Sequence, residues 1–271
     1  MRLRAFLTNF ILVFTLILSV FSVPAEAQDN ADDLAKQLAN PVAALMSVPF
    51  QFNYDKDIGP ADDGERFTLN IQPVIPFVLN DKWNLISRTI LPVVSQDDIY
   101  PGAGDQTGLG DTVQSLFFSP RPGPSGTIWG VGPVFLFPTA TDDLLGTEKW
   151  GAGPTGVVLW QKGTLTYGFL ANYIKSYAGK DSRADISSTY INPFISTRFE
   201  GGWTLGTQLE HTIDHENDQD TGQVSVFLSK VTRIGNQMAS IGVIPRYWYK
   251  DSTSSPEGFG IRLNLTLLFP R

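Results

Sequence analysis

The closing stretch of the chain, GFGIRLNLTLLFPR (residues 258–271), alternates between large apolar side chains and small or polar ones. From Phe259 to Leu267 every odd-numbered residue is large and apolar. The even-numbered residues between them are Gly260, Arg262, Asn264 and Thr266. A period of two predicts a β-strand, because successive side chains of a strand point to opposite faces. The apolar face must meet either a protein core or lipid, and the rest of the sequence decides between them.

The N-terminus has the features of a secretory signal peptide. Arg2 and Arg4 precede an apolar run over residues 10–23, which is followed by the small-residue site Ala25-Glu26-Ala27. This pattern predicts export and cleavage after Ala27, so residues 1–27 are expected to be absent from the mature protein. The alternative, a retained membrane helix, is disfavoured because the apolar run is short for a span.

The composition describes an exported chain without disulfides. The 271 residues include no cysteine, 25 glycines and 18 prolines, and only 17% are charged. The net charge of −7 comes from scattered residues of both signs, which argues against a nucleic-acid partner. No linker-like tract divides the chain, and no motif indicates a cofactor. We therefore expect one main domain, over residues 47–271, preceded by a short N-terminal helix over residues 28–46. We predict this helix to be a periplasmic lead-in; the alternative is a plug that enters the structure.

Two-residue alternation recurs throughout residues 47–271 and predicts twelve strands. The segments that carry it are 48–54, 67–79, 83–95, 111–119, 129–137, 150–161, 165–173, 186–199, 203–210, 223–229, 239–249 and 258–269. Gly, Ser, Thr, Asn and Gln dominate the faces opposite the apolar ones. These residues are too weakly polar for the water-facing side of a soluble sandwich, which is the alternative fold, and they suit a narrow polar lumen.

The connections between these segments alternate between long and short. The long ones are 56–65, 96–110, 138–149, 178–185, 214–222 and 250–257, and the short ones are 80–82, 120–126, 162–163, 200–202 and 233–237. This order places all long loops at one end of an up-and-down barrel, and an even strand count returns both termini to the other end. The sequence therefore predicts an all-β, up-and-down antiparallel transmembrane β-barrel of about twelve strands in the bacterial outer membrane.

Charged residues on the polar faces are the candidate lumen residues. They are Arg66, Arg88, Glu210, Arg246 and Arg262. If the lumen is open, these side chains line a pathway and set its selectivity. The alternative is a lumen filled by their salt bridges. Eight-stranded barrels are filled by side chains and sixteen-stranded barrels leave a channel, so a count of twelve leaves both readings open.

The long connections carry acidic residues, which we expect in extracellular loops. They are Asp142, Asp143, Glu148, Asp214, Glu216, Asp218 and Asp220. Alternating carboxylates can bind calcium, but the EF-hand order is missing, so a solvated acidic loop is favoured and no metal site is predicted. The two histidines, His211 and His215, would lie about 13 Å apart along a strand, too far to share one zinc ion.

Several long stretches resemble a family of Gram-negative outer-membrane barrels. They include LAKQLANPVAALMSVPFQFNYD (34–55), GLGDTVQSLFFSP (108–120) and GVGPVFLFPTATDDLLGTEKWGAGPTGVV (130–158). The family is grouped with the MetA-pathway of phenol degradation proteins and is sometimes mislabelled neuromedin U. The resemblance implies an outer-membrane barrel that transports small organic or aromatic molecules, and it supplies no catalytic residues.

The sequence thus favours a passive channel for small molecules and not an enzyme. Its expected partners are outer-membrane lipid, lipopolysaccharide, the barrel-assembly machinery and a small solute that the sequence does not identify. The second reading is a non-conducting structural or surface-interaction barrel. The third is a lipid-active enzyme using His211, although no G-x-S-x-G motif accompanies it.

Overall fold

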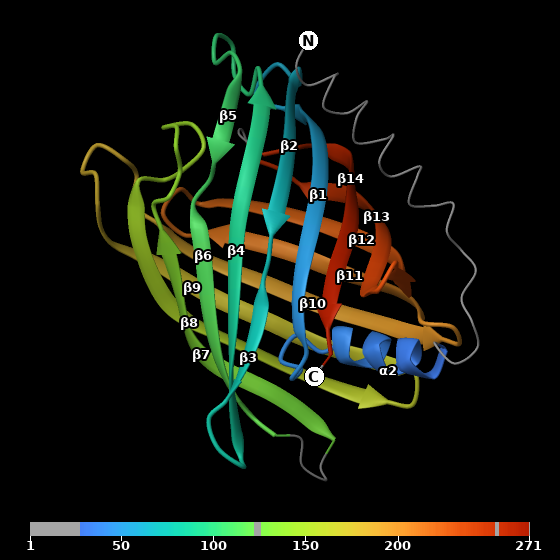
Figure 1. Cartoon of the computed structure of the whole chain (residues 1–271). Helices are drawn as coiled ribbons and strands as arrows, with labels where there is room; N and C mark the ends of the chain where they lie inside the picture. Colours follow the sequence, from blue (N-terminus) through green and yellow to red (C-terminus); the bar gives the residue numbers. More distant parts are fainter. Residues whose placement is uncertain (1–27, 122–125, 253–254, 271) are drawn as a thin grey trace.

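The computed structural model describes residues 28–121, 126–252 and 255–270, so the predicted signal peptide, residues 1–27, lies outside the described residues. Among these residues, helix α2 (Gln28–Leu38) precedes the sheet (Figure 1). The strands are β1 (Met46–Ile58), β2 (Gly64–Ile71), β3 (Val74–Val78), β4 (Trp83–Asp97), β5 (Gln106–Leu109), β6 (Thr112–Pro120), β7 (Thr127–Phe137), β8 (Lys149–Lys162), β9 (Leu165–Gly179), β10 (Ser187–Phe199), β11 (Trp203–Asp214), β12 (Gln219–Ile234), β13 (Gln237–Lys250) and β14 (Gly258–Phe269).

The strands form one closed antiparallel barrel of twelve strands. Each strand pairs with its neighbours in the chain, and β1 closes the barrel by pairing with β14 from Met46↔Phe269 to Tyr54↔Ile261. β2 and β3 both lie between β1 and β4 and make up one barrel strand, and β5 and β6, which both pair with β4, make up another. The predicted fold class and strand count are confirmed.

A proline accounts for the interruption between β2 and β3. Pro73 has no N–H to donate to a neighbouring strand, so the regular ladder cannot continue through it. Backbone bonds on both sides bridge the break: Gln72 N donates to Pro49 O (2.8 Å) and Thr89 N donates to Pro73 O (3.1 Å). The barrel wall therefore stays closed where the strand assignment is interrupted.

Several predicted long connections are shorter in the structure. Only residues 59–63 lie between β1 and β2, where the sequence predicts a loop over 56–65, and β5 lies within the predicted loop over 96–110. The sequence predicts a long loop over residues 214–222, but β11 continues to Asp214 and β12 begins at Gln219, which leaves only residues 215–218 between them. Polar residues such as Thr221, which pairs with Thr212, extend the ladder there. Strand pairing satisfies backbone groups regardless of the side chain, so the apolar alternation underestimates how far these strands extend.

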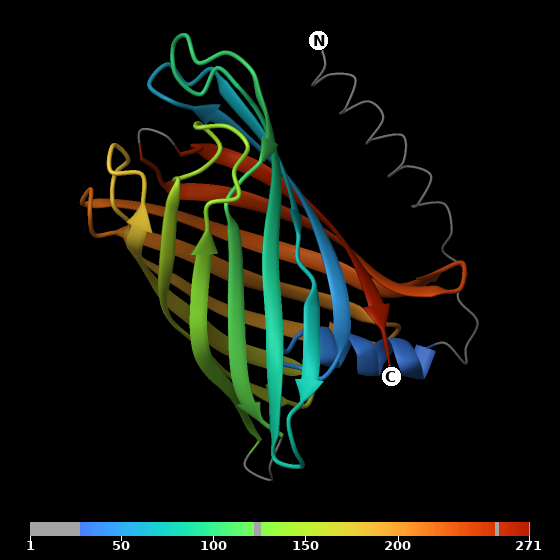
Figure 2. The ribbon, with the colours of Figure 1, turned by 60° about the vertical axis from the view of Figure 1, so that its left-hand side comes forward.

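The outer surface of the barrel is apolar. On β14 the odd-numbered Phe259 is 71% exposed, whereas the even-numbered Arg262 is 6% exposed and Thr266 is buried. Other large apolar side chains on the outside include Phe77, Phe118, Trp129, Val131, Phe169, Ile195, Leu205, Val226 and Tyr247. Figure 2 shows the strands tilted around the barrel. A continuous apolar exterior around a closed barrel is the arrangement that lipid requires.

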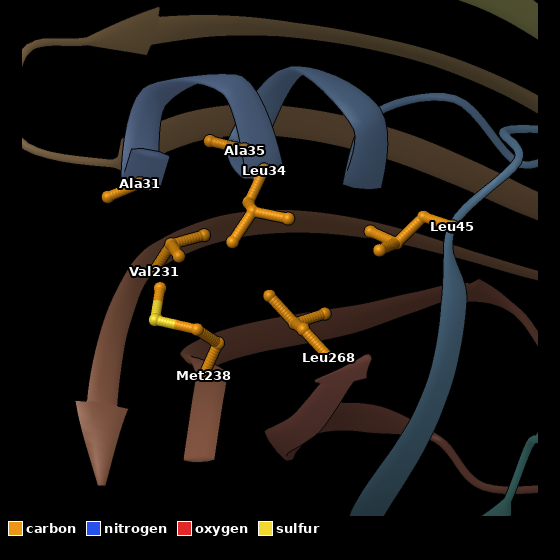
Figure 3. Close-up of a cluster of buried hydrophobic side chains, with 7 residues drawn as sticks. All are labelled: Ala31, Leu34, Ala35, Leu45, Val231, Met238 and Leu268. Atoms are coloured by element: carbon orange, nitrogen blue, oxygen red, sulfur yellow. The ribbon is translucent and has the colours of Figure 1, made fainter. Parts of the chain in front are cut away.

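Helix α2 packs against the inner wall at the short-turn end of the barrel. Ala31, Leu34 and Ala35 form a buried cluster with Leu45 and with wall residues of β12, β13 and β14, namely Val231, Met238 and Leu268 (Figure 3). Asp32 Oδ1 also accepts a hydrogen bond from Gly202 N (2.6 Å) in the β10–β11 turn. The helix ends at Leu38, short of the residue 46 expected from the sequence, and it covers this end of the barrel. The helix in the described residues is not long and apolar enough to span a membrane.

Candidate functional site in the barrel lumen

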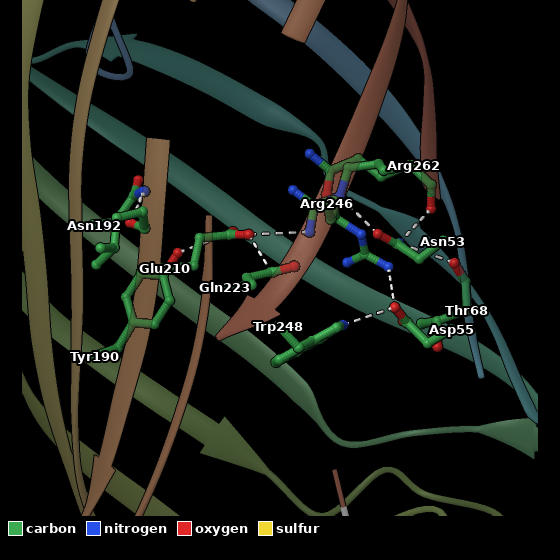
Figure 4. Close-up of polar contacts among 12 residues, drawn as sticks. Asn53, Asp55, Thr68, Tyr190, Asn192, Glu210, Gln223, Arg246, Trp248 and Arg262 are labelled. Atoms are coloured by element: carbon green, nitrogen blue, oxygen red, sulfur yellow. Dashed lines mark hydrogen bonds and ion pairs between the residues drawn. The ribbon is translucent and has the colours of Figure 1, made fainter. Parts of the chain in front are cut away.

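The five candidate lumen residues come from five different strands: Arg66 from β2, Arg88 from β4, Glu210 from β11, Arg246 from β13 and Arg262 from β14. Arg246 and Arg262 are buried, and Glu210 forms an ion pair with Arg262. Together with Asp55 of β1, which pairs with Arg246, they form what we call the lumen charge layer. Figure 4 shows the part of this layer around Asp55, Glu210, Arg246 and Arg262.

Arg246 and Asp55 are the most buried ion pair of the layer. Arg246 Nη2 donates to Asp55 Oδ1 at 2.6 Å, and the same oxygen accepts from Trp248 Nε1 at 3.1 Å. Gly260 lies opposite Arg246 in the sheet, and a Cβ atom there would lie 2.5 Å from Asp55 Oδ1. The absence of a side chain at Gly260 leaves room for the pair.

Arg262 links the two sides of the charge layer. Its Nε donates to Asn53 Oδ1 at 2.6 Å, and its Nη2 lies 3.3 Å from Glu210 Oε2. Glu210 also accepts hydrogen bonds from Tyr190 Oη (3.1 Å) and from Gln223 Nε2. Because both oxygens of this carboxylate have donors, its orientation in the lumen is fixed.

Arg66 and Arg88 are held by amides. Arg66 Nε donates to Gln96 Oε1 (2.9 Å), and Arg88 Nη2 donates to Gln72 Oε1 (3.1 Å). Among the described residues, neither arginine has a carboxylate within ion-pair distance. The charge layer therefore contains four guanidinium groups and two carboxylates, which leaves the middle of the lumen with positive charge.

A chamber of about 310 Å³ lies between helix α2 with its following segment and the side chains of the charge layer. Arg88 and Arg262 line it, together with amides such as Gln72, Asn192 and Asn264. Leu38, Pro41 and Leu45 line it from the N-terminal segment. The barrel therefore encloses a space that the N-terminal segment bounds at the short-turn end.

Part of the inner wall is apolar, in contrast to the polar lumen predicted from the sequence. Val42, from the segment after α2, packs into a buried cluster with wall residues of β4, β6, β8 and β9. Those wall residues are Ile86, Phe117, Val157, Leu159 and Leu170. Ile86, Phe117 and Val157 lie in the segments 83–95, 111–119 and 150–161, where the two-residue alternation is less regular than elsewhere. That irregularity is the signal of an apolar inner wall that the sequence contains. The inner wall is apolar at this place because the segment after α2, and not water, covers it.

The acidic residues of the loops are largely engaged with neighbouring groups. Glu148 forms ion pairs with Lys180 (3.0 Å) and Arg183 (3.4 Å), and Asp143 lies 3.9 Å from Lys180. Asp142 accepts a hydrogen bond from the backbone of the same loop. These contacts order the loops at the long-loop end.

The acidic run around the β11–β12 turn divides into strand and turn positions. Asp214 accepts bonds from Glu216 N (2.9 Å) and Asn217 N (3.2 Å), as expected for an acidic residue that starts a turn. Asp218 adopts a left-handed backbone with φ of 53°, and Asp220 lies in β12. Within the described ranges, no group of three or more His, Asp or Glu side chains is arranged to hold a metal ion.

His211 lies on the outer side near the long-loop end. Its Nδ1 is 2.9 Å from Tyr249 Oη, and its Nε2 is 3.6 Å from Asp220 Oδ2. His215 Nε2 is hydrogen-bonded to Thr189 Oγ1 (2.8 Å). The two imidazoles thus have separate partners, and the polar contacts of His211 involve no serine.

A closed twelve-stranded antiparallel barrel with an apolar exterior and a charged interior defines the class: the chain has the fold of an outer-membrane β-barrel. Comparison with solved structures agrees. An outer membrane channel from Pseudomonas putida F1 has a TM-score of 0.66 and 15% sequence identity, over 83% of this chain and 96% of that chain. The β domain of the Bordetella autotransporter BrkA is less similar, with a TM-score of 0.47 and 12% identity over 83% and 100% of the two chains. Neither a family model nor a curated protein matches the sequence.

Proposed function

We propose that this protein is a channel for small molecules in the bacterial outer membrane and that the lumen chamber is part of its pathway. The carrying observation is the chamber of about 310 Å³ inside a closed barrel, lined by guanidinium and amide groups. A filled structural barrel has no need of such a space. The apolar exterior supports membrane insertion, and the solved channel of similar fold supports the same class of function.

The sequence supports the proposed location and partners. The signal-peptide pattern that ends at Ala27 favours export, with cleavage after that residue. In the outer membrane the barrel would contact lipid and lipopolysaccharide and would be inserted by the barrel-assembly machinery. No step of the proposed function requires a cofactor or catalytic chemistry.

Passage through the barrel requires the N-terminal segment to move. Helix α2 covers the short-turn end through a small apolar cluster and two polar contacts with the wall. These contacts are the Asp32–Gly202 bond and a bond from Gln161 Nε2 to Lys36 O (2.9 Å). The interface is small compared with the strand pairing of the barrel. Beyond the helix, Val42 anchors the following segment in a second apolar cluster, so α2 can move while that segment stays attached. We propose that α2 is a movable cover over the short-turn end.

A non-conducting structural barrel is the second candidate. The observation that favours it is the burial of the Arg246–Asp55 pair, whose side chains are 3% and 8% exposed. Tightly paired charges across a lumen can serve stability alone.

Liposome swelling with the full-length mature protein distinguishes the two candidates. Proteoliposomes are diluted into isotonic solutions of sugars, amino acids and small aromatic acids, and solute entry is followed by light scattering. We expect entry of at least one class of small solute. Heat-modifiable gel mobility serves as the control for folding. A folded protein that admits none of these solutes, and that shows no conductance in a planar bilayer, would refute the channel and leave the structural barrel.

A further inference from the structure

The lumen charge layer has an excess of positive charge at the wall of the chamber. Four guanidinium groups share two carboxylates, and both carboxylates are already paired: Asp55 with Arg246 and Glu210 with Arg262. Within the described part of the chain, Arg66 and Arg88 have no carboxylate partner and are only partly exposed, so bulk water compensates their charge incompletely and an anionic ligand would be favoured beside them. The excess therefore indicates a place for an anion.

Arg88 is the group best placed to bind that anion. It lines the chamber, it is partly exposed to it, and its hydrogen bond to Gln72 uses one of its five N–H donors. Arg262 lines the same chamber. A guanidinium group matches the two oxygens of a carboxylate, so Arg88 can bind a carboxylate through two parallel hydrogen bonds.

The chamber also has an apolar wall that an inorganic anion would not require. Phe194 lies opposite Gly168, where a Cβ atom would come 2.7 Å from the ring. Phe227 lies opposite Gly206 in the same way, at 2.4 Å from such an atom. Both rings thus pack directly over glycine backbone and line the chamber, with Leu170 beside them among the lining residues.

We propose that the chamber binds small amphiphilic monocarboxylates, with the carboxylate on Arg88 and an apolar or aromatic body against Phe194, Phe227 and Leu170. This inference rests on the proposed channel and names its solute class. The volume of about 310 Å³ lies at the lower end of the range for small-molecule pockets. It accommodates a single-ring acid.

Equilibrium binding to the purified full chain in detergent tests the proposal independently of transport. The probes are benzoate, its uncharged analogue benzamide, and acetate, which has the charge without the apolar body. We expect benzoate to bind at least about tenfold more tightly than either of the others, because each probe lacks one of the two interactions. Binding is measured by calorimetry and by saturation-transfer NMR.

Variants then assign the site. Arg88→Met should weaken benzoate binding by about tenfold or more, since it removes a charge-assisted hydrogen bond. Phe227→Ala should weaken binding of benzoate and benzamide alike. Lys82 is exposed and directly precedes the same strand, β4, so Lys82→Met is the matched control and should bind as the wild type does.

Two results would overturn the proposal: equal binding of benzoate and benzamide by the folded wild type, or unchanged benzoate binding by folded Arg88→Met. If Arg88→Met does not fold, the comparison of the three probes on the wild type still decides. A protein that binds benzoate but conducts no solute would refute the channel and keep the site. A protein that conducts but does not discriminate among the probes would refute the binding site and keep the channel.

Discussion

Neutralising Asp55 should destabilise the barrel far more than neutralising Asp57, two residues along the same strand. The side chains of Asp55 and Arg246 are 8% and 3% exposed, so Asp55→Asn leaves a buried guanidinium without its counter-charge. Breaking a buried pair in this way costs about 3–5 kcal/mol. Asp55 Oδ1 also accepts a hydrogen bond from Trp248 Nε1, and the loss of that bond adds to the cost. The polar lumen can partly solvate the unpaired arginine, which lowers the cost. We therefore expect a loss of about 3 kcal/mol in the free energy of unfolding.

Asp57→Asn is the matched control. Asp57 pairs with Lys56 at 2.6 Å, but the two side chains are 37% and 49% exposed, and such pairs contribute at most about 1 kcal/mol. Asparagine also tolerates the left-handed backbone that Asp57 adopts, with φ of 55°. Reversible urea unfolding in lipid vesicles, followed by tryptophan fluorescence, measures both variants. The reasoning fails if Asp55→Asn costs no more than Asp57→Asn, or if Asp55→Asn and Arg246→Met are strictly additive in a double-mutant cycle.

Three further predictions test the facing of the strands, the packing of the charge layer and the loop electrostatics. Arginine at Leu265, on the outer face of β14, should cost about 2–4 kcal/mol, whereas arginine at the inward Asn264 should cost clearly less, and equal losses of folding yield would show that the register is wrong. Gly260→Ala should cost about 1–3 kcal/mol through overpacking against Asp55, and a neutral effect on urea unfolding would contradict the close approach. The hydrogen bond from Lys149 lowers the pKa of the Asp185 carboxyl. The stability that this bond contributes is therefore present above the ordinary carboxyl pKa and is lost as pH falls through the lowered value. Lys149→Met should return the pKa of Asp185 toward its ordinary range in a carboxyl NMR titration, and an unchanged pKa would exclude Lys149 as the cause.

The barrel could be predicted from the sequence because lipid and lumen impose opposite chemistry on alternate residues. The alternation in residues 258–269 is the clearest case, and Arg262 lies inside as that pattern requires. The same rule indicated the inward positions of Arg246 and Glu210, because charged side chains do not fit an outer face in hydrocarbon.

The partners of these residues could not be predicted in the same way. The Arg246–Asp55 pair joins positions 191 residues apart, and it forms only because β1 meets the last strands when the barrel closes. The packing of Val42 could not be predicted from the sequence either. An apolar residue in a short segment after a helix carries no periodicity, so the sequence gives no sign that it packs against Phe117 inside the barrel.

The most direct test of the channel with a movable cover is to lock helix α2 to the wall and measure conductance. A Cβ atom built on Gly202 lies 3.1 Å from Ala31 Cβ, slightly closer than the Cβ atoms of a disulfide, which are about 3.5–4.5 Å apart. A small outward shift of α2 therefore allows the double variant Ala31→Cys/Gly202→Cys to form a disulfide in a chain that has no other cysteine. The left-handed backbone at Gly202 adds strain of about 1 kcal/mol, which the barrel can tolerate. The single variant Ala31→Cys is the control.

The measurement is the conductance of the double variant in a planar bilayer, before and after reduction. We predict that the oxidised protein conducts little, that reduction restores the conductance of the wild type, and that Ala31→Cys responds to neither treatment. Equal conductance of the oxidised and reduced protein, with the disulfide verified by mass spectrometry, would contradict the movable cover. No conductance from the folded wild type would contradict the channel itself.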